Sequence, residues 1–140
     1  MTIKERAQSV VDEFSMFDDW MDKYAYLIEL GKELPLIDEK YKNETHLISG
    51  CQSRVWLHAS YEEEKVSFTA DSDAVITKGI ISLLIRVLSD SKPSDIVTAD
   101  LSFIDEIGLK AHLSPTRANG LVSMIKQMQL YARALHIKNS

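Results

Sequence analysis

The chain has 140 residues, of which 45% are hydrophobic and 26% are charged, with a net charge of −5 and a single cysteine. This composition is typical of a globular protein, and the length fits one domain, so we expect residues 1–140 to form a single domain. The negative charge and the lack of a basic stripe argue against nucleic acid as a partner. Because the chain has neither a signal-peptide pattern nor about 18 consecutive apolar residues, we expect no membrane partner and a cytoplasmic location.

Two amphipathic helices are predicted at the start of the chain. Thr2 and Glu5 have the spacing of a capping box, and apolar residues then recur at helical intervals as far as Phe14. A second helix is predicted over residues 17–34, and Pro35 marks its end. The apolar face of this second helix comprises Phe17, Trp20, Met21, Tyr24, Leu27 and Ile28. The polar residues 38–46 predict a loop.

A β-hairpin is predicted next, because the hydrophobic period changes to two after residue 54. The inward-facing residues of the predicted first strand are Val55, Leu57 and Ala59. The sequence YEEE at residues 61–64 then turns the chain, and the inward-facing residues of the second strand are Val66, Phe68 and Ala70. We expect a third short strand from HLI at residues 46–48.

Helices are predicted for the rest of the chain. Residues 76–88 are apolar almost all round, which indicates a helix buried on most sides. Two short helices are expected in KPSDIV and SFIDEI, before Ser114 and Pro115 begin the last helix as its N-cap and first residue. The apolar face of the last helix comprises Ala118, Leu121, Val122, Ile125, Met128, Ala132 and Leu135. The order of elements predicts an α+β fold, with a small antiparallel β-sheet of about three strands packed against several α-helices.

Cys51 is the residue whose position suggests chemistry. A free cysteine often behaves as a small buried hydrophobe, which is the structural interpretation. Cys51, however, precedes the alternating strand and follows Gly50, whose missing side chain gives a loop access to unusual backbone angles. A metal site is not favoured, because the chain has no CxxC motif and its histidines lack ligand spacing. A stand-alone cysteine hydrolase with His46 or His112 as its base stays open, as does an interaction module with an inert thiol.

Four sequence blocks resemble the SufE family of sulfur acceptors, and they occur in the family's order. The blocks are YLIELGKELP at 26–35, GCQSRVW at 50–56, DSDAVITKG at 71–79 and LSPTRANGL at 113–121. The resemblance extends from about residue 14 to residue 135. The sequence departs from the family pattern at Thr77, where valine is common, and at Thr116, where serine is common; we expect neither residue to touch the sulfur chemistry. The related CsdE acceptors share these blocks, so the resemblance includes them.

The resemblance implies that Cys51 takes persulfide sulfur from a cysteine desulfurase of the SufS or CsdA type. The acceptor also stimulates that desulfurase and passes the sulfur on to a scaffold for iron–sulfur cluster assembly. In this family the desulfurase carries pyridoxal phosphate (PLP), so we expect no cofactor in this chain. The transfer is similar to thiol–disulfide exchange, in which the thiolate fraction and access to the sulfur control the rate.

Several other residues are expected to support the thiol or its loop. Arg117 lies in the first turn of the last helix, where a guanidinium and the helix N-terminus together favour an anion such as a thiolate. The alternative for Arg117 is an ion pair with Asp71 or Asp73. The family resemblance implies that Asp73 helps to fix the loop. Gly50 is the expected hinge, and the polar neighbours expected to bond to the loop backbone are Ser49, Gln52 and Ser53.

Overall fold

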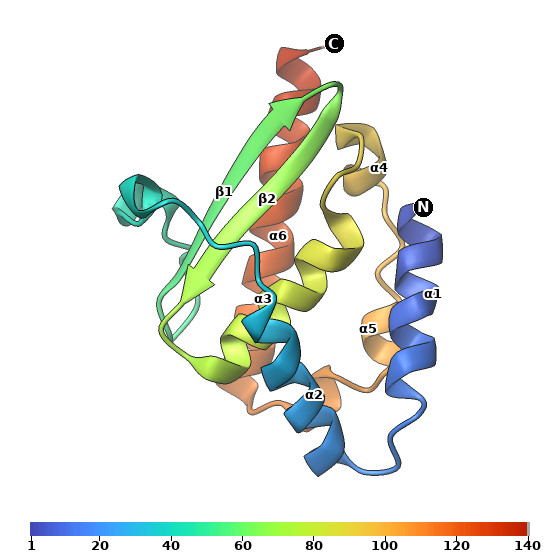
Figure 1. Cartoon of the computed structure of the whole chain (residues 1–140). Coiled ribbons are helices and arrows are strands. Elements are labelled where there is room, and N and C mark those ends of the chain that lie inside the picture. Colours follow the sequence, from blue (N-terminus) through green and yellow to red (C-terminus); the bar gives the residue numbers. More distant parts are fainter. Residues whose placement is uncertain (140) are drawn as a thin grey trace.

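The computed structural model describes residues 1–139, in which a β-hairpin is surrounded by helices (Figure 1). Helices α1 (Ile3–Phe14) and α2 (Trp20–Lys32) precede the antiparallel strands β1 (Val55–Glu62) and β2 (Lys65–Ser72). The remaining helices are α3 (Val75–Leu88), α4 (Pro93–Val97), α5 (Phe103–Glu106) and the long α6 (Pro115–Lys138). Short 3₁₀ helices lie at Glu39–Tyr41, Glu44–His46 and Lys110–His112. Within the described residues, every helix is too short or too polar to cross a membrane.

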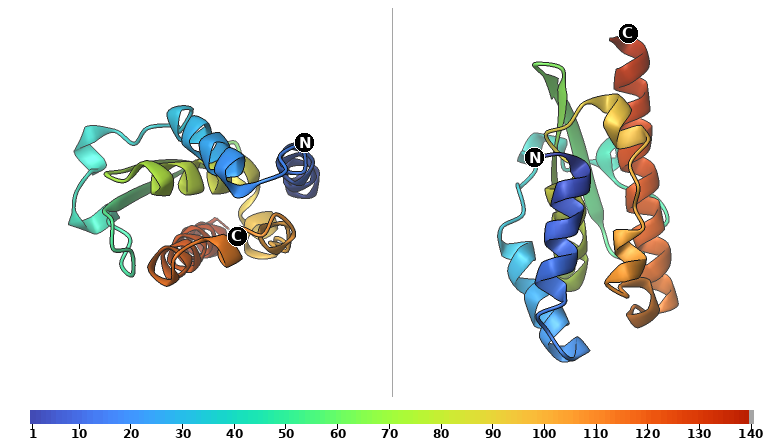
Figure 2. Two further views of the ribbon diagram at one scale, coloured as in Figure 1. Left: turned by 90° about the horizontal axis from the view of Figure 1, so that it is seen from below. Right: turned by 90° about the vertical axis from the view of Figure 1, so that its right-hand side faces the viewer.

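Helix α3 lies at the centre of the fold. Figure 2 shows α3 and the hairpin as a middle layer, with α2 on one side and α6 on the other. Helices α2 and α3 cross so closely that a Cβ atom on Gly79 would lie 2.2 Å from the carbonyl oxygen of Leu27. The α+β prediction is confirmed, and α3 is buried almost all round as its apolar sequence indicates.

The hairpin has the predicted alternation, but the sheet has two strands and not three. Inward-facing residues of both strands are buried, namely Val55, Leu57, Val66, Phe68 and Ala70. The expected third strand is reduced to a single bridge between Leu47 and Trp56. The physical reason is that Asn43 caps a 3₁₀ turn ending at His46, which leaves only two extended residues before the next loop.

Two predicted helical faces need correction. Helix α2 begins at Trp20 and not at residue 17, because the Asp19 side chain accepts a hydrogen bond from the Asp22 amide at 2.9 Å and caps the helix there. Met21, predicted to be on its apolar face, is 83% exposed. In α6, Val122 is 50% exposed. The buried residues of α6 follow one helical stripe that includes Met124 and passes Val122 by, and they are Gly120, Leu121, Met124, Met128 and Ala132.

The hairpin turn contains a strained backbone that predicts a stabilising substitution. Glu63 and Glu64 have φ values of 52° and 65°, in the left-handed region that costs a residue with a side chain about 1–2 kcal/mol. Asn-Gly is the pair that such two-residue turns favour. We therefore expect the double substitution Glu63→Asn/Glu64→Gly to raise the free energy of unfolding by about 1–2 kcal/mol in urea denaturation.

The control for this prediction is Glu63→Gln/Glu64→Gln, which removes the same two charges and leaves the backbone requirement unchanged. An equal gain in stability in this control would show that charge repulsion, and not backbone strain, destabilises the turn.

Candidate functional site

The single cysteine lies in a loop whose ends are fixed in the core. We define the Cys51 loop as residues 49–54. At its base, the Ile48 amide donates a hydrogen bond to the Val55 carbonyl at 2.8 Å, and both residues are buried. This hydrogen bond closes the loop where β1 begins, so the two ends of the loop are held in the buried core.

A second anchor holds the end of the Cys51 loop at the β2–α3 connection. The Arg54 amide donates to Asp73 Oδ1 at 3.0 Å, and Ser72 Oγ donates to the Arg54 carbonyl at 2.8 Å. The Asp73 amide also donates to the Arg54 carbonyl, at 3.3 Å. Asp73 thus lies where the sequence analysis expected it, in contact with the loop that contains Cys51.

The loop leans on α6 at positions where side chains are missing. Gly50 has a φ of +90°, and a Cβ atom added to it would lie 2.5 Å from Ser123 Oγ. The half-buried Cys51 thiol points at the Gly120 carbonyl, with a sulfur–oxygen distance of 3.7 Å. A Cβ atom on Gly120 would lie 3.5 Å from Cys51 Sγ, which is an ordinary van der Waals contact, so the sulfur packs directly against this part of α6.

A cavity of about 390 Å³ opens beside the thiol, where the Cys51 loop meets α3 and the first turns of α6. Its lining comprises Cys51, Gln52, Ser53, Thr77, Ile80, Ser114, Thr116, Arg117, Gly120 and Met124. Thr77 and Thr116, the two departures from the family pattern, are both in this lining, and the expectation that neither touches the sulfur chemistry stays a prediction. Both carry a hydroxyl group, so they give this wall of the cavity a hydrogen-bonding capacity that valine at residue 77 would lack.

The electrostatics of the site favour a neutral thiol in this conformation. Burial raises the pKa of the Cys51 thiol, because a thiolate is poorly solvated there. Arg117 is exposed, lines the same cavity and forms no ion pair within residues 1–139. Asp71, its expected alternative partner, instead binds Lys42 at 2.6 Å and Lys78 at 3.4 Å. The guanidinium of Arg117 is therefore available for an anion that enters the cavity.

The polar residues of the loop do not make the expected contacts. Ser49 and Gln52 are exposed, and Ser53 is half-buried. Among the described residues, no hydrogen bond joins any of these three side chains to the loop backbone; the loop is held by Ile48, Arg54 and the β2–α3 connection instead. Gln52 and Ser53 do line the cavity, so their proposed role in supporting the thiol stays a prediction.

The two histidines considered as bases lie away from the thiol. His46 contacts His58 and Asn43, whereas His112 stacks on Trp20 with ring centroids 4.0 Å apart. Neither is among the residues that line the cavity, although a general base must lie within hydrogen-bonding reach of its proton. The geometry therefore does not support a cysteine hydrolase. Within residues 1–139, no three histidine, cysteine or acidic side chains are grouped as metal ligands.

The fold and the loop thiol thus define a small α+β protein that presents one sheltered cysteine beside an arginine-lined cavity. The family model for SufE, described as an Fe-S metabolism associated domain, matches residues 8–132. An uncharacterised SufE-like protein of Rhizobium meliloti is 39% identical over 86% of this chain and 89% of its own length. The cysteine desulfuration protein SufE of Wigglesworthia glossinidia brevipalpis is 37% identical over 91% of this chain and 90% of its own length. The chain therefore belongs to the SufE family.

A solved structure supports the fold. The solution structure of a hypothetical protein from Thermus thermophilus superposes with a TM-score of 0.77, covering 92% of this chain and 94% of the other at 21% identity.

Several residues of the site were not found from the sequence. The Ser72 hydroxyl donates to the Arg54 carbonyl, and the Ser123 hydroxyl lies against Gly50. A serine in a helix or at a strand end carries no sequence signal of such a contact. Gly120 did carry one, since a glycine inside a helix costs about 1 kcal/mol relative to alanine and often marks a close approach.

The anchor at Asp73 predicts how the loop can be loosened. Asp73→Ala removes the oxygen that accepts from the Arg54 amide, so the Cys51 loop should open more often. A hydrogen bond to a charged group contributes about 1.5–3 kcal/mol, so we expect iodoacetamide to alkylate Cys51 about tenfold faster or more. Asp73→Asn keeps the accepting oxygen and should react at close to the wild-type rate. Equal rates for all three proteins would remove Asp73 from the control of the loop.

The buried thiol also predicts a pH dependence. The alkylation rate of the urea-unfolded protein should have its midpoint near the ordinary cysteine pKa of about 8.5. Because burial raises the pKa of Cys51, the midpoint for the native protein should lie at a higher pH. The native state prefers the neutral thiol, so its contribution to stability is present at low pH and is lost as the pH rises through the native pKa. Cys51→Ser should abolish this loss. A native midpoint at or below the unfolded one would contradict the sheltered thiol.

Proposed function

We propose that this protein accepts sulfur at Cys51 from a cysteine desulfurase and carries it towards iron–sulfur cluster assembly. The observation that carries the proposal is a lone thiol that is half-buried against Gly120, 3.7 Å from its carbonyl oxygen, in a loop fixed by a few hydrogen bonds. Membership of the SufE family supports it, as does the name of the relative from Wigglesworthia, a cysteine desulfuration protein.

The proposed reaction moves one sulfur atom without net oxidation. The desulfurase holds a cysteine persulfide, and the Cys51 thiol gives up its proton to solvent or to the partner before attack. The Cys51 thiolate bonds to the outer sulfur, the sulfur–sulfur bond of the desulfurase breaks, and the desulfurase cysteine leaves as a thiolate that takes up a proton. One persulfide and one thiol are consumed, and one persulfide and one thiol are formed.

The cavity beside Cys51 suits the product of this transfer. A persulfide extends one sulfur beyond the thiol, and the adjoining space of about 390 Å³ accommodates it out of bulk solvent. A persulfide ionises more readily than a thiol, and the first turn of α6 offers it Arg117 and a positive helix N-terminus. We propose that this wall stabilises the loaded form and limits its loss to other thiols.

Transfer itself requires the thiol to leave this position. The contacts that hold the loop are local, so it can open without unfolding the core. We propose that the desulfurase, of the SufS or CsdA type, receives the opened loop and turns over faster as a result. In this proposal PLP belongs to the desulfurase, and the chain needs no cofactor of its own. An iron–sulfur scaffold then receives the sulfur, and the reaction takes place in the cytoplasm.

The test is sulfur loading in the presence of a purified SufS-type desulfurase, cysteine and PLP, followed by intact-mass measurement. The wild-type protein should gain the mass of one or more sulfur atoms, and Cys51→Ser should gain none while keeping its circular-dichroism spectrum. Ser49→Ala, in the same loop, is the matched control and should load like the wild type. Sulfur gained by Cys51→Ser, or no gain by the wild type with either a SufS-type or a CsdA-type desulfurase, would overturn the proposal.

A further inference from the structure

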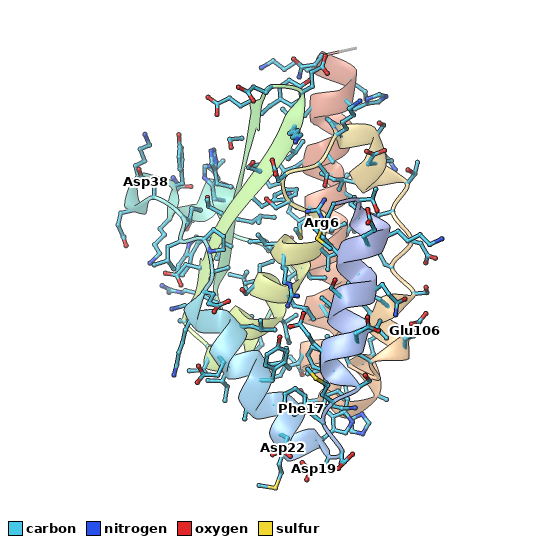
Figure 3. All side chains as sticks on the ribbon, turned by 45° about the vertical axis from the view of Figure 1, so that its right-hand side comes forward. Arg6, Phe17, Asp19, Asp22, Asp38 and Glu106 are labelled. Carbon is cyan, nitrogen blue, oxygen red and sulfur yellow. The ribbon has the colours of Figure 1, made fainter. Side chains whose placement is uncertain are left out.

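The chain reaches the Cys51 loop through a segment that crosses the outer face of the hairpin. We call residues 38–48 the strap; it runs along β1 in Figure 1, and Asp38 at its start is labelled in Figure 3. The strap ends at Ile48, whose amide closes the base of the Cys51 loop. Any change in how the strap is fastened therefore acts directly on one end of that loop.

His58, on the outer face of β1, holds the part of the strap that includes His46. Lys42 holds the strap separately, because it binds Asp71 at 2.6 Å and lies over the Trp56 ring at 5.4 Å. The Tyr41 ring stacks on the His58 ring, with centroids 3.8 Å apart and an interplanar angle of 8°. His58 Nδ1 lies 3.2 Å from His46 Nε2, within hydrogen-bonding distance. Two strap residues thus converge on a single imidazole from the strand.

The hydrogen-bond network assigns the protons of the two histidines. The Asn43 side-chain oxygen accepts from the His46 amide at 3.3 Å and lies 3.0 Å from His46 Nδ1, so that ring nitrogen carries the proton. When His46 is neutral, its Nε2 accepts from His58 Nδ1. The chain of contacts runs from His58 through His46 to Asn43, and it requires that at least one of the two facing ring nitrogens, His46 Nε2 or His58 Nδ1, carry no proton.

We propose that the contact between His46 and His58 is pH-sensitive, and that protonation of both imidazoles releases the part of the strap next to the Cys51 loop and loosens that loop. A first proton can enter at His58 Nε2, and the contact between the rings survives as a charge-assisted hydrogen bond. A second proton must occupy His46 Nε2, which removes the acceptor and brings two positive rings together. Release therefore needs a proton on both facing ring nitrogens.

The surrounding groups set the direction of this titration. Lys40 lies over the Tyr41 ring at 5.1 Å and adds positive charge near the pair. Burial, the charge of His46 and that of Lys40 all lower the pKa of His58, in that order. The acid Asp71, on the same face of β2, is already paired with Lys42. Thr69, which faces His58 across the hairpin, and Asn43, which contacts His46, have uncharged side chains. The contact between His46 and His58 is thus present at neutral pH and is lost as the pH falls.

The consequence for sulfur transfer rests on the proposed function, but the release itself does not. If Cys51 carries sulfur, acidification would expose the Cys51 thiol or its persulfide even when no desulfurase is bound. The test therefore uses the free protein and a reagent for thiols, with no desulfurase present.

The experiment measures Cys51 labelling by 4,4′-dithiodipyridine, which reacts with thiols in acid as well as at neutral pH. The rate in the native protein is divided by the rate in the same protein unfolded in urea at the same pH, from about pH 7.5 to about pH 5. This ratio cancels the intrinsic chemistry of the thiol, because both forms lie well below their pKa. We expect the wild-type ratio to rise by about tenfold across this pH range, which is a change of about 1.4 kcal/mol in the free energy of opening the loop.

Two variants isolate the histidine pair. His58→Phe keeps an aromatic ring against Tyr41 but cannot titrate, and His46→Gln keeps an acceptor for His58 Nδ1 but cannot become an imidazolium. Both ratios should stay flat across this pH range, whereas His136→Phe, in the exposed last turns of α6, should rise like the wild type. A flat wild-type ratio, or a wild-type rise retained in His46→Gln, would overturn the proposal, even if His58→Phe proved unstable.

Discussion

The contact between the Cys51 loop and α6 is the feature on which the site depends. It depends on Gly50, which has a positive φ and lies so close to α6 that a Cβ atom on it would be 2.5 Å from Ser123 Oγ. The thiol consequently rests against helix backbone instead of extending into solvent. The cavity lined by Arg117 lies next to it because the same helix begins only a turn and a half earlier, at Ser114.

Two electrostatic effects act in opposite directions on the sulfur. Burial raises the pKa of the thiol, so the unloaded protein keeps it neutral and unreactive towards stray electrophiles. The helix N-terminus and the unpaired guanidinium of Arg117 favour an anion, but they adjoin the cavity and do not contact the resting sulfur through a hydrogen bond. A group that extends into the cavity gains from them more than the thiol does. Under the proposed function, this arrangement would favour a persulfide that extends into the cavity over a free thiolate in the resting conformation.

The parts of the fold that the sequence predicted well are those with local signals. The capping box at Thr2, the Ser114-Pro115 start of α6 and the alternation of the hairpin each depend on neighbouring residues, and each is present. The errors arose where tertiary packing decides. Met21 and Val122 have the spacing of core residues but face solvent, because the neighbouring elements lie to one side of them.

The residues of the candidate site also divide into those with a signal in the sequence and those that depend on tertiary packing. Cys51 was identified from its glycine neighbour and from the family blocks, and Asp73 from resemblance alone; the structure places Asp73 against the loop. The contacts of Ser72, Ser123 and Gly120 join segments far apart in the sequence, so a single sequence contains no pattern that pairs them. The same holds for His46 and His58, whose ring contact depends on how the strap folds back over β1.

The central claim is that the Cys51 thiol becomes reactive only when its loop opens as a unit. The most direct measurement compares the free energy of opening from hydrogen exchange of the Arg54 amide with the protection of Cys51 against alkylation, on one sample at one pH. The two values should agree within about 0.5 kcal/mol and lie below the free energy of global unfolding. Rapid alkylation of Cys51 while the Arg54 amide stays protected would show that the thiol is reached without loop opening, and would contradict this account.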